Sequence, residues 1–460
     1  MNPPQGLRFV STREDGLCMR LNTILDAMLL AKATAGTFGF TWDEQQTHAL
    51  DQQTTSALAK VFTPGFITQH RLTTPGPAPV LTPVRTAQAL ADLTTAAGRS
   101  GVIHLDQPRD LTRFAPVLAD RLGARAYGGA FAALDFTPDI RRAIALARAL
   151  PVTESAVAIH LRGGDILHGT HAHHESYLHK APSVLEIDAL IARLTGEGHA
   201  VWLIGQEPDV MACMARRHPA AILPAPMALG EVEQVIFDAV LMSRMQAIFG
   251  GNSGVTLLSR RLGGQPFHDL ARQPPVADPA TWRADPLAAP AFAGVSAAMK
   301  AHSYVKVITA SDPPSWTDLH LDLITLARRW RPDSKFLALV QVCVLTQLGQ
   351  TDAAETLARA LLAEPLSPAI LPEMGLAVLT EAGHFFPLGL TAPLVAINGH
   401  PALQVFAALR QAVTEPSSHH AAEAALASAL DSLGAQAIDP PLLTMIDRFM
   451  RETAPPAQSR

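Results

Sequence analysis

The sequence predicts an α/β protein in which a region of parallel β-sheet is followed by a helical region. From residue 151, short apolar runs alternate with segments of helical period, which is typical of repeated β-α units and a parallel sheet. Several of these runs end in glycine-rich turns, as expected where a strand leads into a helix. From about Ser315, the pattern is helical to the end of the chain.

The composition is that of a globular protein and excludes several classes. The 460 residues are enough for about three domains of ~150 residues each. With 48% hydrophobic and 17% charged residues, the chain is expected to form large cores. A formal net charge of −5 gives no reason to expect a nucleic-acid partner.

The spacing of the cysteines and the length of the apolar stretches indicate where in the cell the protein is expected. Cys18, Cys213 and Cys343 are far apart and lack metal-ligand spacing, so we expect reduced thiols in a cytoplasmic protein. The first residues lack the apolar core of a signal peptide, and no run approaches the ~20 apolar residues of a membrane helix. We therefore expect no transmembrane segment. The alternative is a peripheral protein at the inner membrane, as for an enzyme whose substrate is linked to the membrane.

The N-terminal region begins with a glycine turn that opens a helix. Residues 15–22 contain this turn, apolar residues at helical spacing follow, and a strand is expected at 38–42. A helix N-terminus with Arg20 beside it is suited to binding an anion. Many α/β proteins begin in the same way without such a site. A further strand is expected at 101–105 and a helix at 139–150.

The most informative stretch is the predicted strand Ala156–Leu161, which ends in Arg162-Gly-Gly-Asp165. His160 and Arg162 are two residues apart, so in a strand they project to the same side. Open parallel sheets bind ligands at the carboxyl ends of their strands. The alternative is an Arg–Asp surface pair after an ordinary strand.

A second strand end with binding potential is Phe249–Thr256, where glycines are followed by Asn252 and Ser253 and then a helix. Ser253 is predicted to cap that helix, and its hydroxyl or the following amides are suited to an anion. The segment is neither a P-loop nor a dinucleotide fingerprint. The alternative is a glycine turn with a helix cap and no ligand.

A histidine-rich loop follows the predicted strand at 156–161. It contains no HExxH pattern, and a polar loop gives no fixed geometry, so we predict no metal there. Asp165 and Glu175 are better candidates for a chemical role than the histidines, because a carboxylate can act as a general base and remove a proton from a sugar hydroxyl. The histidines are His168, His171, His173, His174 and His179.

Three of these segments together resemble a known family. The turn at Gly16–Leu21, the strand end His160–Asp165 and the run Asp238–Ser253 occur in the order found in the α1,2-, α1,6- and protein O-fucosyltransferase group, which includes the bacterial nodulation fucosyltransferase. The resemblance covers roughly residues 8–270. It implies a GT-B fold of two Rossmann-like domains and an inverting, metal-independent transfer from GDP-fucose to a glycan or protein. The third match is the most specific and covers Asp238, Leu241, Met242, Ser243, Asn252 and Ser253.

The resemblance also implies roles for residues on the donor side. Arg162 would hold the β-phosphate and stabilise the departing diphosphate, as a guanidinium does by forking onto phosphate oxygens. Ser253 would contact phosphate together with its neighbours Asn252 and Gly254. Asp238 would contact the nucleoside or orient Arg162.

Other positions would complete the site by the same resemblance. Arg20 would face the donor, and His160 would line the donor pocket. Asp165 and Glu175 would bind the acceptor or act as the base. No bound cofactor and no metal are implied, since the sugar nucleotide is the substrate.

The sequence departs from the group at three points. Met19 stands where the family has asparagine, and Gly163 replaces a second arginine. After the strand at 200–204, Gln206-Glu207 replaces an acidic pair, so that Glu207 alone is left to accept hydrogen bonds from guanine.

Beyond residue 270 the composition changes to a proline-rich segment and then to helices. Residues 335–349 and 352–362 are predicted to form a tetratricopeptide-type hairpin, and 401–413 and 420–433 a looser one closed by Gly434. A plain helical appendage is the alternative. The predicted domains are 1–150 (acceptor side), 151–272 (donor nucleotide), 273–314 (proline-rich linker) and 315–452 (TPR-like helices).

Two classes of function remain open at this point. The first is an active fucosyltransferase-like enzyme. The second is a binding or scaffold protein with a degenerate transferase-like domain, which works through a protein partner on its helical region. Retention of Arg162, Asp165, Asp238 and Ser253 favours the enzyme, whereas Met19 and Gln206 favour the scaffold.

Overall fold

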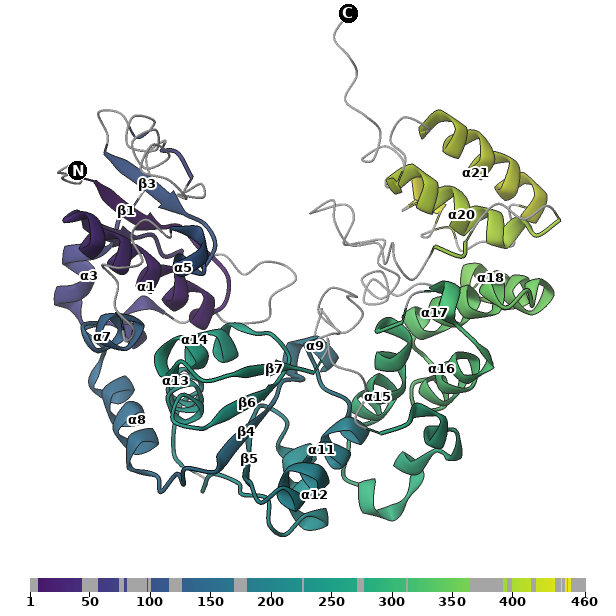
Figure 1. The fold of residues 1–460 in the computed structure, drawn as a ribbon. Coiled ribbons are helices and arrows are strands. Elements are labelled where there is room, and N and C mark those ends of the chain that lie inside the picture. Colours follow the sequence, from purple (N-terminus) through teal and green to yellow (C-terminus); the bar gives the residue numbers. More distant parts are fainter. Residues whose placement is uncertain are drawn as a thin grey trace, which may run out of the picture. The chain divides into compact units, whose positions relative to one another are not determined.

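The chain forms two compact units, each assembled from separate segments (Figure 1). The first unit contains Met1–His160, Leu194–Gly205 and Ala220–Asp269, and the second contains Leu161–Arg193, Gln206–Pro219 and Leu270–Arg460. The computed structural model describes residues 7–43, 57–73, 78–80, 97, 101–115, 126–168, 180–225, 227–270, 277–311, 313–363, 392–394, 399–414, 419–434, 440, 443, 444, 446 and 447.

The first sheet has three parallel strands in the order β2-β1-β3. These are β1 (Arg8–Ser11), β2 (Thr37–Phe40) and β3 (Val102–Leu105), and helix α1 (Leu17–Thr34) connects β1 to β2. The strands expected at 38–42 and 101–105 are confirmed. Strand β1 is not predicted from the sequence, because it has only four residues and begins and ends with polar ones.

The second sheet has the order β5-β4-β6-β7 and, apart from Leu161, lies in the first unit. Its strands are β4 (Ala156–Leu161), β5 (Ala200–Gly205), β6 (Ala247–Gly250) and β7 (Phe267–Asp269). Strand β6 pairs in parallel with both β4 and β7. The α/β class with parallel sheets is therefore confirmed. The apolar run at 221–223 contributes only a single bridge, between Ile222 and Trp202.

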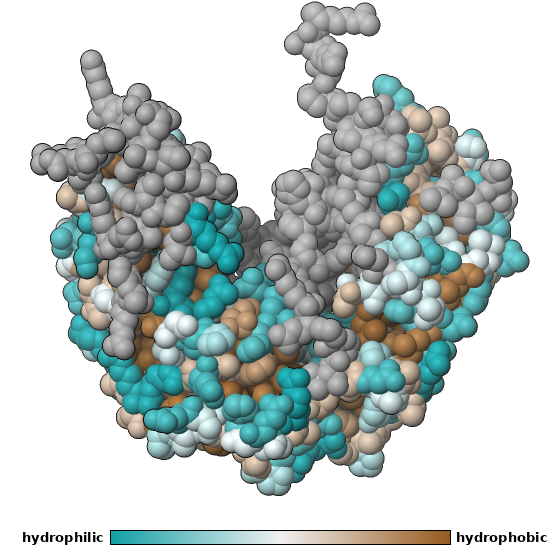
Figure 2. All heavy atoms as spheres, in the orientation of Figure 1, coloured by the Kyte–Doolittle hydropathy of each residue, from teal (hydrophilic) through white to brown (hydrophobic). Residues whose placement is uncertain are grey.

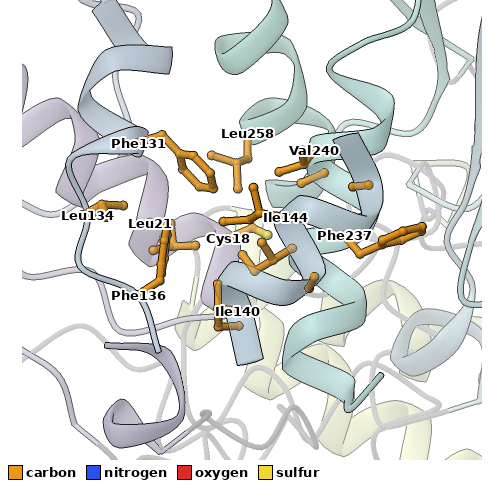
Figure 3. Packing of buried hydrophobic residues seen from close by; sticks show 14 of the residues in the cluster. Cys18, Leu21, Phe131, Leu134, Phe136, Ile140, Ile144, Phe237, Val240 and Leu258 are labelled. Atoms are coloured by element: carbon orange, nitrogen blue, oxygen red, sulfur yellow. The ribbon is translucent and has the colours of Figure 1, made fainter. Parts of the chain in front are cut away.

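The helices of the first unit pack into two hydrophobic clusters, of which the larger contains α8 and α13. Helix α8 (Pro138–Ala149) buries Ile140, Ala143, Ile144 and Ala147, which recur at helical spacing. Figure 3 shows Ile140 and Ile144 packed near Phe237 and Val240 of α13 (Glu231–Met242). Burying each such side chain contributes roughly 1.5–3 kcal/mol. The other helices are α2 (Leu58–Val61), α3 (Pro64–His70), α5 (Leu111–Phe114), α7 (Ala126–Ala132) and α14 (Gly254–Gly263).

The second unit is helical in its described residues. Helices α17 and α18 pack as one hairpin and α20 and α21 as another, as expected from the sequence. Gly349 (φ +73°) and Gly434 (φ +82°) follow α17 and α21 in the left-handed conformation that ends helices. The assignment to the tetratricopeptide type stays a prediction. The helices are α9 (Gly164–His168), α11 (Val184–Gly196), α12 (Pro208–Arg217), α15 (Ala297–Thr309), α16 (Asp318–Trp330), α17 (Lys335–Gln347), α18 (Thr351–Ala363), α20 (Pro401–Thr414) and α21 (His419–Leu433).

The proline-rich segment contains more structure than the predicted linker. Before α15, its prolines start three 3₁₀ turns, at Pro279–Ala284, Pro286–Ala288 and Pro290–Phe292. Proline suits the first position of such a turn, because the backbone N–H there has no hydrogen-bond partner within the turn. The buried helix α15 follows. Its Lys306 forms a buried ion pair with Glu186 of α11. The segment is thus an integral part of the second unit.

Helix α20 begins against a carboxylate from α18. Glu355 accepts hydrogen bonds from the backbone N–H groups of Ala402 (3.1 Å) and Leu403 (3.0 Å). Arg359 pairs with the same carboxylate at 2.7 Å. A carboxylate at a helix N-terminus satisfies free N–H groups and favours the helix dipole.

The described surface is mixed in character. On the face in Figure 2, hydrophilic and hydrophobic residues are interspersed over the described parts. Among the described helices, none combines the length and the apolar character that a membrane span requires.

Candidate functional site

Strands β4 and β6 bring two of the sequence motifs to one point on the sheet. His160 near the end of β4 is paired with Gly250 at the end of β6. Gly250 has φ +155°, and a Cβ atom there would lie 2.9 Å from the carbonyl oxygen of His160. Glycine is therefore required, because it alone combines this backbone conformation with so close an approach. His160 is buried, with 3% of its surface exposed.

Beyond β6, helix α14 begins with a capping box. The Oγ of Ser253 accepts from the N–H of Thr256 (3.2 Å), and the Oγ1 of Thr256 accepts from the N–H of Ser253 (2.9 Å). The predicted cap is confirmed, and Thr256 is a member that the sequence analysis missed. Asn252 precedes the cap and is exposed. The buried cap leaves the polar N-terminus of α14 in a fixed orientation.

The first turn of α1 lies directly against the first turn of α14. A Cβ atom on Gly254 would lie 3.0 Å from Met19 Cγ and 3.2 Å from Cys18 Cβ. Asn22 Nδ2 donates to the carbonyl oxygens of Cys18 (2.7 Å) and Gly254 (3.1 Å). Two helix N-termini thus meet, and each carries the partial positive charge that favours an anion.

Asp238 is a buried carboxyl group on α13. It accepts a hydrogen bond from Gln234 Nε2 at 2.7 Å, and 5% of its surface is exposed. Burial raises its pKa from 3.8 to about 7, against the smaller lowering effect of the Gln234 hydrogen bond. A buried carboxyl group with such a perturbed pKa is typical of functional sites, although structural networks also produce one.

Replacing Asp238 with asparagine should change how stability depends on pH. The folded protein keeps the Asp238 proton up to about pH 7, whereas the unfolded chain loses it near 3.8, so stability falls as the pH rises through this range. Asparagine keeps the acceptor for Gln234 and removes this loss. We expect the Asp238→Asn protein to be more stable than wild type by about 2–4 kcal/mol at pH 8 and by much less at pH 4. Urea unfolding at both values tests this, and an equal difference at each would contradict it.

Arg20 has structural partners in its own unit. Its Nε donates to the carbonyl oxygen of Asp15 (2.7 Å), and its Nη atoms donate to the carbonyl oxygens of Asp43 (3.3 Å) and Glu14. The guanidinium also lies 4.7 Å from the centre of the Trp42 ring, and its surface is 1% exposed. Through these contacts Arg20 stabilises the loop that follows β1.

A buried polar network joins α1 to α14, and sequence reasoning missed it. Arg261 of α14 donates to Asp26 Oδ2 (3.2 Å) and Asn22 Oδ1 (3.2 Å). Tyr127 Oη donates to Asp26 Oδ1 at 2.7 Å, and the N–H of Arg109 donates to Oδ2 at 2.7 Å. An acidic residue inside the apolar stretch of α1 is the one signal that could have indicated a buried partner.

In the second unit, Arg162 follows β4 directly and is half-buried. Glu207, which precedes α12, lies next to the turn after Arg162. Its Oε1 accepts from the N–H of Gly164 at 2.6 Å. The carboxylate that was expected to bind guanine therefore contacts the backbone of this turn.

Two predicted acceptor-side carboxylates lie beyond what the structure describes. Asp165 belongs to α9, but its side chain is outside the described residues, and so are Glu175 and most of the histidine loop. Within the described part of the chain, no group of three or more His, Cys, Asp or Glu side chains is arranged to hold a metal ion.

Comparison with known proteins finds similarity only among solved structures. No protein family model and no curated protein match the chain. NodZ α1,6-fucosyltransferase soaked with GDP-fucose has a TM-score of 0.35 and 17% identity, over 56% of this chain and 92% of NodZ. POFUT1 in complex with GDP-fucose has a TM-score of 0.34 and 11% identity, over 57% and 97%. A mutant of Arabidopsis thaliana FUT1 in complex with GDP has a TM-score of 0.35 and 10% identity, over 56% and 69%.

Proposed function

We propose that this chain is a GT-B-type glycosyltransferase that transfers fucose from GDP-fucose to a glycan or protein acceptor with inversion and without a metal. The observation that carries the proposal is the pairing of His160 with Gly250. It supports a single donor site at the carboxyl ends of β4 and β6, which is where open parallel sheets bind nucleotides.

The donor's diphosphate would be held by charge and by helix termini. Arg162 follows β4, and its planar guanidinium is suited to forking onto the β-phosphate. The amides that follow Ser253 at the N-terminus of α14 would bind a further phosphate oxygen. His160 and Asp238 would lie on the nucleoside side, with Asn252 beside the phosphates.

The reaction is a displacement at the anomeric carbon. The acceptor hydroxyl oxygen forms a bond to that carbon from the face opposite the diphosphate, while the bond from the carbon to the phosphate oxygen breaks. The electron pair of the broken bond leaves with the diphosphate, whose growing negative charge Arg162 would stabilise. The hydroxyl proton passes to a carboxylate, for which Asp165 and Glu175 are the candidates.

A scaffold protein with an inactive transferase-like domain is the second candidate. It is favoured by the contacts of Arg20 and Glu207, since both predicted donor ligands bind backbone groups of the protein itself. The helical hairpins of the second unit would then bind a protein partner, as stacked helical hairpins offer concave surfaces.

A panel of nucleotides separates the two candidates. The thermal unfolding of the full chain would be measured with GDP, UDP, dTDP and their sugar derivatives, each with and without a metal chelator. For the enzyme we expect GDP and GDP-fucose to stabilise the protein by about 2.7 kcal/mol at 100 times Kd, with no effect of the chelator. A response to none of the nucleotides would support the scaffold, and a response that the chelator abolishes would contradict metal independence.

A further inference from the structure

The turn that carries Arg162 is built around the Glu207 carboxylate. Glu207 Oε1 accepts from the N–H of Gly164 at 2.6 Å, and the Glu207 side chain is buried, with 6% of the residue exposed. A short hydrogen bond from an amide to an ionised carboxylate is stronger than one between neutral groups. The contact therefore fixes the backbone two residues after Arg162.

The same carboxylate occupies the space that a side chain at position 163 would need. A Cβ atom on Gly163 would overlap Glu207 Oε1 and Cδ and lie 3.0 Å from its Cγ. Gly163 is buried, and its carbonyl oxygen accepts from the N–H groups of Ile166 (2.8 Å) and Leu167 (3.0 Å), so the turn cannot easily move away. Glycine at 163 and glutamate at 207 are thus sterically linked.

A third contact fastens the turn on its other side. The N–H of Gln206 donates to the carbonyl oxygen of Leu161 at 2.9 Å, which ties the segment after β5 to the residue before Arg162. Gly164 has φ +27°. The backbone on both sides of Arg162 is therefore held by Gln206 and Glu207, the two residues that follow β5.

We propose that Glu207 is a positioning residue that orients Arg162 toward the diphosphate and does not recognise the nucleobase. This role rests on the proposed function of Arg162. It also accounts for the missing second arginine, because the Glu207 carboxylate fills the place where a side chain at 163 would begin.

Binding of GDP and GMP to the full chain distinguishes the two roles of Glu207. Both nucleotides carry guanine, but only GDP has the β-phosphate assigned to Arg162. We expect Glu207→Ala to weaken GDP binding about 10- to 100-fold and GMP binding less than about twofold, as for the loss of a hydrogen bond to a charged group. Glu207→Gln keeps an acceptor for Gly164 and should restore most of the GDP affinity. Asp209→Ala, which removes an exposed carboxylate two residues further along, is the matched control and should bind both nucleotides as wild type does.

A double-mutant cycle tests the steric link directly. Gly163→Ala should weaken GDP binding, whereas Gly163→Ala combined with Glu207→Ala should bind no worse than Glu207→Ala alone, because the overlap has been removed. A cooperative thermal unfolding transition would show that each variant is folded. Equal losses for GMP and GDP, or additive effects in the cycle, would overturn the role of Glu207. Failure of the wild-type protein to bind either nucleotide would overturn the proposed function and this role with it.

Discussion

Replacing Arg162 with alanine is expected to reduce transfer about 10³-fold or more, with the fold unchanged. The guanidinium is the group proposed to stabilise the diphosphate as it leaves, and removal of such a group costs most in the transition state. Because Arg162 is only half-buried and follows its strand, its loss should leave the thermal unfolding temperature close to that of wild type. Release of GDP from GDP-fucose, with water as the acceptor where no other is known, provides the assay.

The matched control is Arg113→Ala, since the Arg113 side chain is 90% exposed. It should keep both the rate and GDP binding. Arg162→Lys keeps a positive charge but loses the planar fork, so we expect an intermediate rate. A rate near that of wild type for Arg162→Ala would show that the phosphate is held by another group.

Replacing Arg261 with methionine is expected to destabilise the first unit by about 3–5 kcal/mol at pH 8, because the Asp26 carboxylate would remain buried without its cation. The Arg261 and Asp26 side chains are 8% and 0% exposed, so water cannot take over the missing contacts. Urea unfolding measures the loss. Arg260→Met is the control on the same helix, where the arginine lies 5.6 Å from the centre of the Phe267 ring and a smaller loss is expected.

The loss from Arg261→Met should depend on pH in a definite direction. Burial raises the pKa of Asp26 from 3.8 to about 6, and Arg261 opposes this rise. In the variant the pKa goes higher still, so Asp26 stays protonated over a wider range and stability falls as the pH rises through that range. The deficit relative to wild type should therefore be smaller at pH 5 than at pH 8. A deficit independent of pH would mean that lost packing, and not the unpaired carboxylate, is the cause.

Local patterns predicted the elements that carry the site. The apolar run of β4, the glycines after β6 and the cap at Ser253 are each determined by a few neighbouring residues, and the structure has all three where they were expected. Strand β1 was not predicted, since a four-residue strand with Arg8 at its start has too little pattern to detect.

The contacts of individual charged residues could not be predicted in the same way. Arg261 and Asp26 are 235 residues apart, and Glu207 and Gly164 are 43 apart, so only the folded chain brings them together. The resemblance assigned Arg20 and Glu207 by position in a motif. It contained no information on the backbone groups of Asp15, Asp43 and Gly164 that bind them here.

The Glu355 contact with α20 has a consequence for how the two hairpins stack. Because this carboxylate binds N–H groups in the first turn of α20 directly, a contact between the two helices themselves holds the register of α20 on α18. The way the two hairpins stack therefore depends on a single carboxylate of α18 as well as on packed apolar side chains.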